Sequence, residues 1–174
     1  MKNTIKFLIT ILLLMVTINC SAQHVVDPDS DKFAGTWKWG NDVNGLVIIM
    51  KKENNMNLLG GNNPQRIDGI LGFHTLVKNG LVVDDFLSFS NTNSADRKYS
   101  FFGVTGIHDA EPNILRTWGR HKGKSVEMMI QYLDATHIKI TDVQNMEGQG
   151  IRVQGQPPMD WSIDIPVNII LTKQ

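Results

Sequence analysis

The sequence predicts an all-β fold, an antiparallel up-and-down meander of about 8–10 strands that closes into a barrel or a strongly curled sheet. Three observations predict it. Apolar residues recur with period two or in short runs, turn-forming residues separate these runs, and no segment shows the longer apolar period of a helix. Closure is expected because an open meander would leave exposed strand edges.

Before the strands begin, residues 1–22 are typical of a secretory signal peptide. Two lysines precede an apolar run, residues 7–18, which is shorter than the roughly 20 residues that cross a bilayer. Small residues favour cleavage after Ala22, whereas the alternative makes Cys20 the lipidated first residue of a lipoprotein. We favour the first, because Asn19 stands where lipoprotein signals usually carry Gly, Ala or Ser. The protein is therefore expected to be exported, periplasmic or extracellular, and anchored to the outer membrane only if Cys20 is lipidated.

Cysteine content and charge indicate how the domain is stabilised and which partners are not expected. Cys20 is the single cysteine, so no disulfide can form within the chain and the domain depends on its apolar core. The chain carries 17 basic and 17 acidic residues without a basic tail, which gives no reason to expect a nucleic-acid partner. A polar leader, residues 23–32, precedes a single domain, residues 33–174.

Nine strands are expected in that domain, each an apolar segment bounded by Gly, Asn, Asp or Pro. They cover residues 35–39, 46–51, 67–76, 81–90, 99–108, 114–120, 126–133, 137–143 and 165–172. NDVNG joins the first strand to the second, KNG the third to the fourth, HKGK the sixth to the seventh, and LDAT the seventh to the eighth. Such short turns make consecutive strands antiparallel neighbours.

Two longer segments do not follow a strand pattern. Residues 54–65 (NNMNLLGGNNPQ) are polar, as at the end of a hairpin, and residues 144–164 are rich in Gly, Gln and Pro, with at most a short strand near 151–153. Long loops in compact domains are often functional. The second segment is therefore either a functional loop or an ordinary connection to the last strand.

The first expected strand contains two of the four tryptophans, in FAGTWKW at residues 33–39. Alternation sends Trp37 and Trp39 to one face and Lys38 to the other, so two indoles are expected to fill the base or the lower cavity of a barrel. The tripeptide GTW resembles the G-x-W motif with which lipocalins begin their first strand. That resemblance implies that the Trp closes one end of the barrel by packing under the last strands.

A wider resemblance covers nearly the whole expected domain. FAGTWKW, LVIIMKKE at residues 46–53, PNILR at 112–116 and the terminal IPVNIILTKQ follow an order similar to that of small secreted Bacteroidetes proteins grouped as a domain of unknown function. The resemblance implies a location in the cell envelope and a lipocalin-like sheet. It implies no activity.

Local motifs for catalysis or metal binding are absent from the sequence. The histidines are never closely paired, so there is no H-E-x-x-H, and there is no G-x-S-x-G. Asp84 and Asp85 are adjacent and point to opposite faces of a strand. His74 and His108 could still meet in space as a metal site, the alternative being surface or hydrogen-bonded histidines. We expect no cofactor and no metal, and a hydrolase only if folding assembles a carboxylate pair or a His-centred cluster.

Binding is the function class that these exclusions leave. Alternation places Arg116, Trp118 and Arg120 on one face of their strand. Inside a barrel this row would suit an anionic amphipathic ligand, whose apolar part the indole would cover while the guanidinium groups pair with a carboxylate or phosphate; outside, it is a solvated row. Trp39, on the expected inner face, and Trp161, next to two prolines, complete the candidate ligand-binding residues.

Two hypotheses for function follow from these patterns. The first is an exported barrel that binds a small apolar or amphipathic ligand. The alternative is a barrel filled by its own side chains, with no ligand cavity, that acts through its loops as a protein-interaction module.

Overall fold

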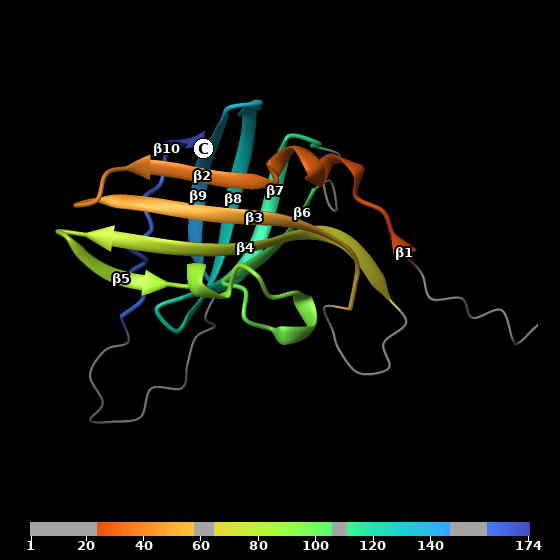
Figure 1. The fold of residues 1–174 in the computed structure, drawn as a ribbon, viewed down its shortest axis with the longest axis horizontal. Coiled ribbons are helices and arrows are strands. Elements are labelled where there is room, and N and C mark those ends of the chain that lie inside the picture. Colours follow the sequence, from red (N-terminus) through yellow and green to blue (C-terminus); the bar gives the residue numbers. More distant parts are fainter. Residues whose placement is uncertain (1–23, 58–64, 106–110, 147–159) are drawn as a thin grey trace, which may run out of the picture.

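The computed structural model describes residues 24–57, 65–105, 111–146 and 160–174 (Figure 1). The expected signal peptide at residues 1–22, with Cys20, lies outside these ranges. Within them, every long element is a strand, and the only helices are short 3₁₀ segments. None of the helices in this described part is long and apolar enough to span a membrane.

The strands are labelled in chain order. They are β1 (His24–Val25), β2 (Gly35–Gly40), β3 (Gly45–Met56), β4 (Arg66–Lys78), β5 (Leu81–Asp85), β6 (Phe101–Thr105), β7 (Ile114–His121), β8 (Lys124–Asp134), β9 (His137–Asn145) and β10 (Ile169–Lys173). Three 3₁₀ helices accompany them: η1 (Pro28–Phe33), η2 (Leu87–Phe89) and η3 (Ser94–Asp96).

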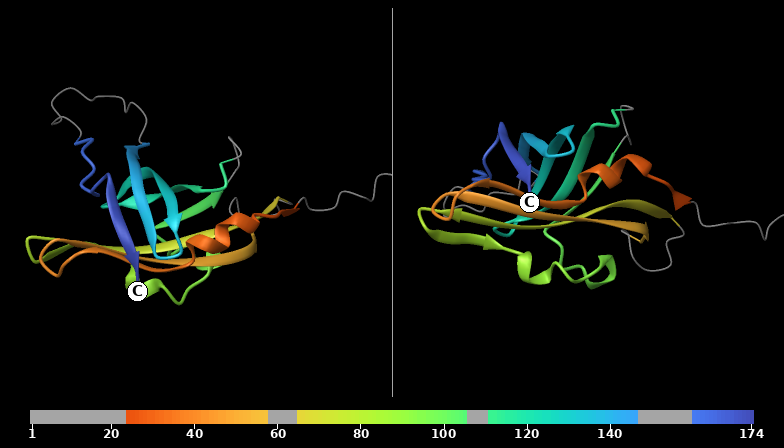
Figure 2. Two further views of the ribbon diagram at one scale, coloured as in Figure 1. Left: turned by 90° about the horizontal axis from the view of Figure 1, so that it is seen from above. Right: turned by 45° about the horizontal axis from the view of Figure 1, so that its top comes forward.

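Eight of the strands form a closed barrel. They pair antiparallel in the order β2–β3–β4–β6–β7–β8–β9–β10, and β10 returns to pair with β2. Strands β2 to β4 form one side, and β7 to β9 cross over it on the other (Figure 2). The structure therefore confirms the predicted all-β fold, an antiparallel up-and-down meander closed into a lipocalin-like barrel.

Two strands lie off this circuit, and both add to β4. Strand β5 folds back antiparallel on the C-terminal part of β4, and β1 pairs in parallel with its start. Residues 23–32, expected as a polar leader, contribute β1 and most of η1. Asp27 ties this segment to the barrel, because its carboxylate accepts hydrogen bonds from the backbone N–H and the hydroxyl of Thr105.

Several expected strands have different boundaries in the structure, and for two of them a single residue explains the difference. The strand expected at residues 81–90 ends at Asp85, whose carboxylate accepts a hydrogen bond from the backbone N–H of Leu87 at 3.0 Å and turns the chain into η2. The strand expected at 165–172 begins only at Ile169, because Asn168 has a left-handed backbone with φ of 58°. The short strand expected near 151–153 lies outside the described residues.

The barrel interior is filled by apolar side chains. Alternate residues of the barrel strands point inward and pack into one cluster with Phe33 and Ile165 from the flanking segments. Its buried members are Phe33, Trp37, Leu46, Ile48, Met50, Ile70, Leu76, Phe101, Leu115, Met128, Ile130, Ile138, Ile140, Ile165 and Leu171. A smaller cluster of Met56, Leu71 and Phe73 lies on the outer face of β3 and β4, where Phe86, Leu87, Tyr99 and Phe102 pack against it.

Candidate functional site

A cluster of histidine and aspartate side chains lies at one end of the packed barrel interior, and the length of β6 explains it. Gly72 on β4 pairs with Phe101, the first residue of β6, and Phe101 pairs with Gly119 on β7. Strand β6 does not extend beyond this level. Two residues further along, at residue 74 of β4 and residue 121 of β7, no strand therefore separates β4 from β7. The inward side chains at this level are His74 and His121, and they meet there.

Three side-chain atoms from three strands converge at this point. His74 Nε2 lies 3.2 Å from His121 Nδ1 and 3.3 Å from Asp84 Oδ2, and His121 Nδ1 lies 3.0 Å from Asp84 Oδ2. Asp84 reaches the cluster because β5 continues along the edge of β4 that β6 leaves open, with Asp84 opposite the inward Leu76. Both histidines are buried, at 2% and 1% exposure. These are groups that could together hold a metal ion.

Further polar groups surround these three atoms. Asp164, on the segment before β10, lies with its Oδ1 2.5 Å from His121 Nε2. Its other carboxylate oxygen is 3.2 Å from Lys122 Nζ and 3.5 Å from Lys78 Nζ. The backbone N–H of Lys122 donates to Asp84 Oδ2 at 2.9 Å. The tight turn after β7 therefore positions the Asp84 carboxylate, and Asp164 positions the His121 ring.

The protonation states follow from these contacts. Burial alone would raise the pKa of Asp84, but the hydrogen bond from His74 and the Lys122 N–H outweigh it and lower that pKa. Burial likewise opposes ionisation of Asp164, yet the hydrogen bonds from His121 and Lys122 lower its pKa to about 2. For His121, burial outweighs the neighbouring carboxylates and lowers the pKa. Near neutral pH the cluster therefore contains two carboxylates beside a neutral His121.

One atom of the cluster is unsatisfied. Among the described residues, His74 Nδ1 is buried without a hydrogen-bond partner. The Phe86 ring packs beside this imidazole with the ring centroids 5.7 Å apart. A buried polar atom without a partner is costly, and an apolar residue at this position would avoid the cost. The reason for a histidine at this position therefore lies in the contacts of Nε2, which faces His121 and Asp84.

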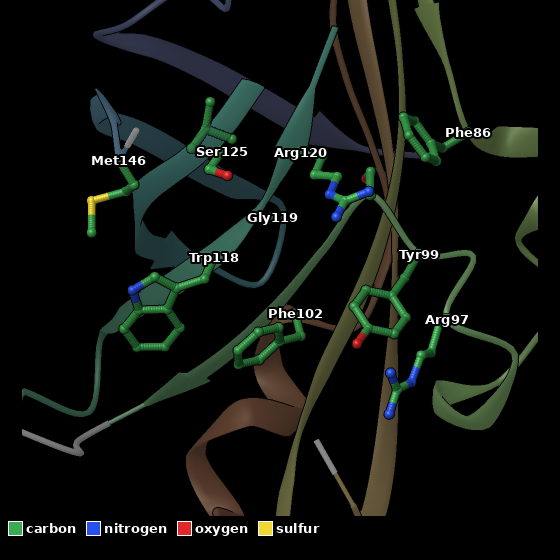
Figure 3. A pocket seen from close by; sticks show the side chains of 11 residues that line it. Phe86, Arg97, Tyr99, Phe102, Trp118, Gly119, Arg120, Ser125 and Met146 are labelled. Atoms are coloured by element: carbon green, nitrogen blue, oxygen red, sulfur yellow. The ribbon is translucent and has the colours of Figure 1, made fainter. Parts of the chain in front are cut away.

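A second feature is a groove on the outer face of β6 and β7, with a volume of about 620 Å³ (Figure 3). Three aromatic rings follow one another along it: Trp118 lies 5.6 Å from Phe102, its cross-strand partner, and Phe102 lies 6.3 Å from Tyr99, measured between ring centroids. Arg97 and Arg120 lie on either side of Tyr99. Within the described ranges neither guanidinium group has an ion-pair or hydrogen-bond partner.

The structure brings together some of the predicted ligand-binding residues but not all of them. Arg116, Trp118 and Arg120 share a face, as alternation predicts, but it is the outer face, because Leu115 and Thr117 point into the barrel. Trp118 and Arg120 line the groove, whereas Arg116 lies 3.4 Å from Glu127 on β8.

The other two predicted residues lie apart from the groove lining. Trp39 is half-buried and packs against the barrel core, as expected for the inner face of β2. Trp161 is 42% exposed, and its carbonyl accepts a hydrogen bond from the Asn145 side chain. These two tryptophans therefore join neither the groove nor the histidine cluster.

Sequence reasoning missed His121, Asp84 and Asp164 as members of one site. It considered His74 with His108, which lies outside the described residues. Alternation does place His121 on the inner face with Leu115 and Thr117, and this was the available signal. The meeting of β4 and β7 depends on where β6 begins, which local pattern does not reveal.

The fold and these two features define a class: an eight-stranded, antiparallel, lipocalin-like β-barrel with a packed interior, a polar cluster at one end and an aromatic groove outside. The chain matches the model of a family described as "Family of unknown function (DUF6705)" over residues 1–174, and it belongs to that family. Comparison with curated proteins and with solved structures found no significant match. The predicted membership in a group of unknown function is confirmed to this extent.

Proposed function

We propose that this protein is an exported barrel that binds a small anionic, amphipathic ligand in the outer groove over β6 and β7. The observation that carries the proposal is a row of three aromatic rings beside two arginines without acidic partners in the described part of the chain. The ligand class is the one expected from the sequence. Its place is different, because the barrel interior is occupied by the apolar core.

The chemistry of the groove supports an anionic amphipathic ligand. Trp118 and Phe102 offer a continuous apolar wall for a hydrocarbon or ring system. Arg97 and Arg120 can pair with a carboxylate or phosphate through planar, bidentate hydrogen bonds. A volume of about 620 Å³ is within the range of small-molecule sites, roughly 300–1,000 Å³.

Binding is expected to be saturable and to depend on the groove residues. We expect isothermal titration with fatty acids and isoprenoid phosphates to show one site, which Arg120→Gln weakens about tenfold by removing a charge-assisted pair. Trp118→Ala should weaken binding to a similar extent by removing the apolar wall. Calorimetry is preferable to fluorescence here, because Trp118 is itself a fluorophore.

Arg116→Gln is the matched control for this experiment, since Arg116 lies on the same face of β7 but pairs with Glu127 outside the groove. It should bind like the wild type. No saturable heat with any member of the panel, or equal losses in Arg116→Gln and Arg120→Gln, would refute the groove as a ligand site.

The packed interior favours a second candidate, a filled barrel that acts as a protein-interaction module. In that case the groove would contact a partner protein rather than a small molecule. Pull-down from envelope extract would then recover one specific partner with the wild type and with Arg116→Gln, but not with Trp118→Ala. A saturable small-molecule isotherm would instead support the first candidate.

Export is the other part of the proposal, and the N-terminus of the mature protein tests it. Mass spectrometry of the protein purified from its native type of host should show a chain that begins at Gln23. A chain that begins with lipid-modified Cys20 would instead indicate a membrane-anchored lipoprotein. Recovery of the intact chain from Met1 in the cytoplasm would contradict export.

A further inference from the structure

We propose that His74 Nε2, His121 Nδ1 and Asp84 Oδ2 bind a divalent transition-metal ion at the end of the barrel, with Asp164 as the residue that orients His121. Zinc is the ion whose ligand preferences best fit two imidazole nitrogens and one carboxylate oxygen. The site is independent of the outer groove, because the metal ligands point into the barrel and Arg120 and Trp118 point out.

The distances among the three atoms match those between ligands of one metal ion. Zinc lies about 2.0–2.2 Å from His nitrogen and carboxylate oxygen, so two ligands of a tetrahedral site are about 3.3 Å apart. The three separations here are 3.2, 3.3 and 3.0 Å. An ion about 2.05 Å from all three atoms would lie about 0.9 Å out of their plane, compared with about 0.7 Å in a regular tetrahedron. The three separations are therefore compatible with one shared ion.

With a neutral His121 imidazole, the arrangement of protons and lone pairs also favours a cation between these atoms. The 2.5 Å contact between His121 Nε2 and Asp164 Oδ1 requires a proton on Nε2. In the neutral imidazole, Nδ1 then carries a lone pair, and it faces Asp84 Oδ2 at 3.0 Å. Two lone pairs at this distance repel each other. A metal ion between them converts the repulsion into two coordinate bonds.

The Asp84 charge provides a separate argument. The side chain is 15% exposed, and its partners among the described residues are the two histidines and the Lys122 N–H, with no lysine or arginine side chain. By contrast, Asp164 is paired with Lys122 and Lys78. A divalent ion would neutralise the Asp84 carboxylate in a region too buried for water to screen it fully.

Two of the three ligands, His121 and Asp84, have the surroundings expected at a metal centre. A histidine that binds a metal usually donates its second ring N–H to a carboxylate, which holds the ring in the right orientation. Asp164 has this role toward His121, and the Lys122 N–H holds Asp84. Three protein ligands leave a fourth position for water or an anion, as in catalytic zinc sites. Asp84 is the most exposed of the three ligands, so exchange would occur on its side.

The test uses the full mature protein, stripped with a chelator and titrated with Zn²⁺ by calorimetry and with Co²⁺ by visible absorption. The wild type should bind one equivalent of either ion, and Co²⁺ should give the intense visible bands of a four-coordinate site with nitrogen ligands. Asp84→Asn should weaken Zn²⁺ binding by at least about 100-fold. Asp164→Asn removes no ligand and should weaken it about 10- to 100-fold, the usual effect of losing such an orienting partner.

Asp85→Asn is the matched control, because Asp85 neighbours Asp84 in sequence but points to the backbone of Leu87. It should bind Zn²⁺ within about threefold of the wild type. Circular dichroism of each metal-free variant establishes that it is folded. If Asp84→Asn fails to fold, Asp164→Asn provides the decisive comparison. The Asp164 side chain is 27% exposed, so its replacement disturbs folding less.

The competing explanation is a network held by protons alone, with a protonated imidazole between the carboxylates. In that case the wild type would bind Zn²⁺ and Co²⁺ no more tightly than Asp84→Asn or Asp164→Asn. Equal loss in Asp85→Asn would likewise overturn the proposal, because binding would then lie elsewhere on the surface. Tight binding that only Asp84→Asn and Asp164→Asn weaken would establish the site.

Discussion

Trp37→Ala is expected to lower the free energy of unfolding by about 3–5 kcal/mol, the usual cost of removing a large core aromatic. The Trp37 side chain is fully buried, and its Nε1 donates to the carbonyl of Phe33 at 2.8 Å. Trp37 lies where the barrel closes, because it pairs with Lys173 across the β2–β10 junction. The truncation therefore leaves a cavity and an unpaired Phe33 carbonyl at the junction of the first and last barrel strands.

Lys38→Ala provides the control, one residue away on the opposite face. The Lys38 side chain is 39% exposed, and its ion pair among the described residues is a 3.6 Å contact with fully exposed Asp42. Surface substitutions of this kind usually change stability by less than about 0.5 kcal/mol. Urea unfolding followed by far-ultraviolet circular dichroism measures both variants without depending on tryptophan fluorescence. Equal shifts of the two midpoints would contradict the inward position of Trp37.

Gly72→Ala is expected to destabilise the barrel by about 1–3 kcal/mol through overpacking. A Cβ atom on Gly72 would lie 2.0 Å from Phe101 Cζ, because the Phe101 ring covers this glycine from the neighbouring strand. The Phe101 side chain is almost completely buried, so it cannot move away without disturbing the core. The glycine is required here by space and not by its backbone angles.

A double-mutant cycle tests this explanation directly. Phe101→Ala alone should cost about 3–5 kcal/mol. In the Phe101→Ala background, Gly72→Ala should cost little or should stabilise, because the added methyl group enters the space that the ring occupied. Denaturant unfolding of the four proteins gives the coupling energy.

Gly119→Ala is the comparison on the other side of Phe101. Its Cβ would lie 2.1 Å from the backbone oxygen of Ser100, which the loss of a ring does not remove. Its cost should therefore remain in the Phe101→Ala background. If Gly72→Ala were equally costly with and without the ring, the clash with Phe101 would not be its cause.

The sequence alone determined the class of fold, because the signals for it are local. Alternation on each strand depends on a period of two residues, and the turns at NDVNG, KNG, HKGK and LDAT depend on residues that tolerate a left-handed backbone or that hydrogen-bond the local backbone, as Asn41 and Asp134 do. Asn79, in the KNG turn, and Lys122, in HKGK, have such backbones, with φ of 53° and 51°. Alternation also separated inward Trp37 from outward Lys38 correctly. Closure could be anticipated because an open edge is unfavourable in any long meander.

Strand ends were less predictable, because single side chains decide them. The strand that begins at Leu81 ends at Asp85 through one hydrogen bond to the backbone of Leu87, although Leu87 and Phe89 continue an apolar pattern. Strand β1 is only two residues long and pairs with β4, far along the chain. A pattern of two residues has no detectable period.

Only the tertiary structure decided which face of β7 is inside and which residues form the histidine cluster. Alternation puts Arg116, Trp118 and Arg120 together on either face, and the choice depends on how β6 and β8 align with β7. His74 and His121 are 47 residues apart, and His121 and Asp164 are 43 apart. His74 and His121 meet because β4 and β7 both pair with β6 and come together where β6 has not begun. Contacts of this kind depend on strand order and register, which are properties of the whole sheet and not of any local stretch of sequence.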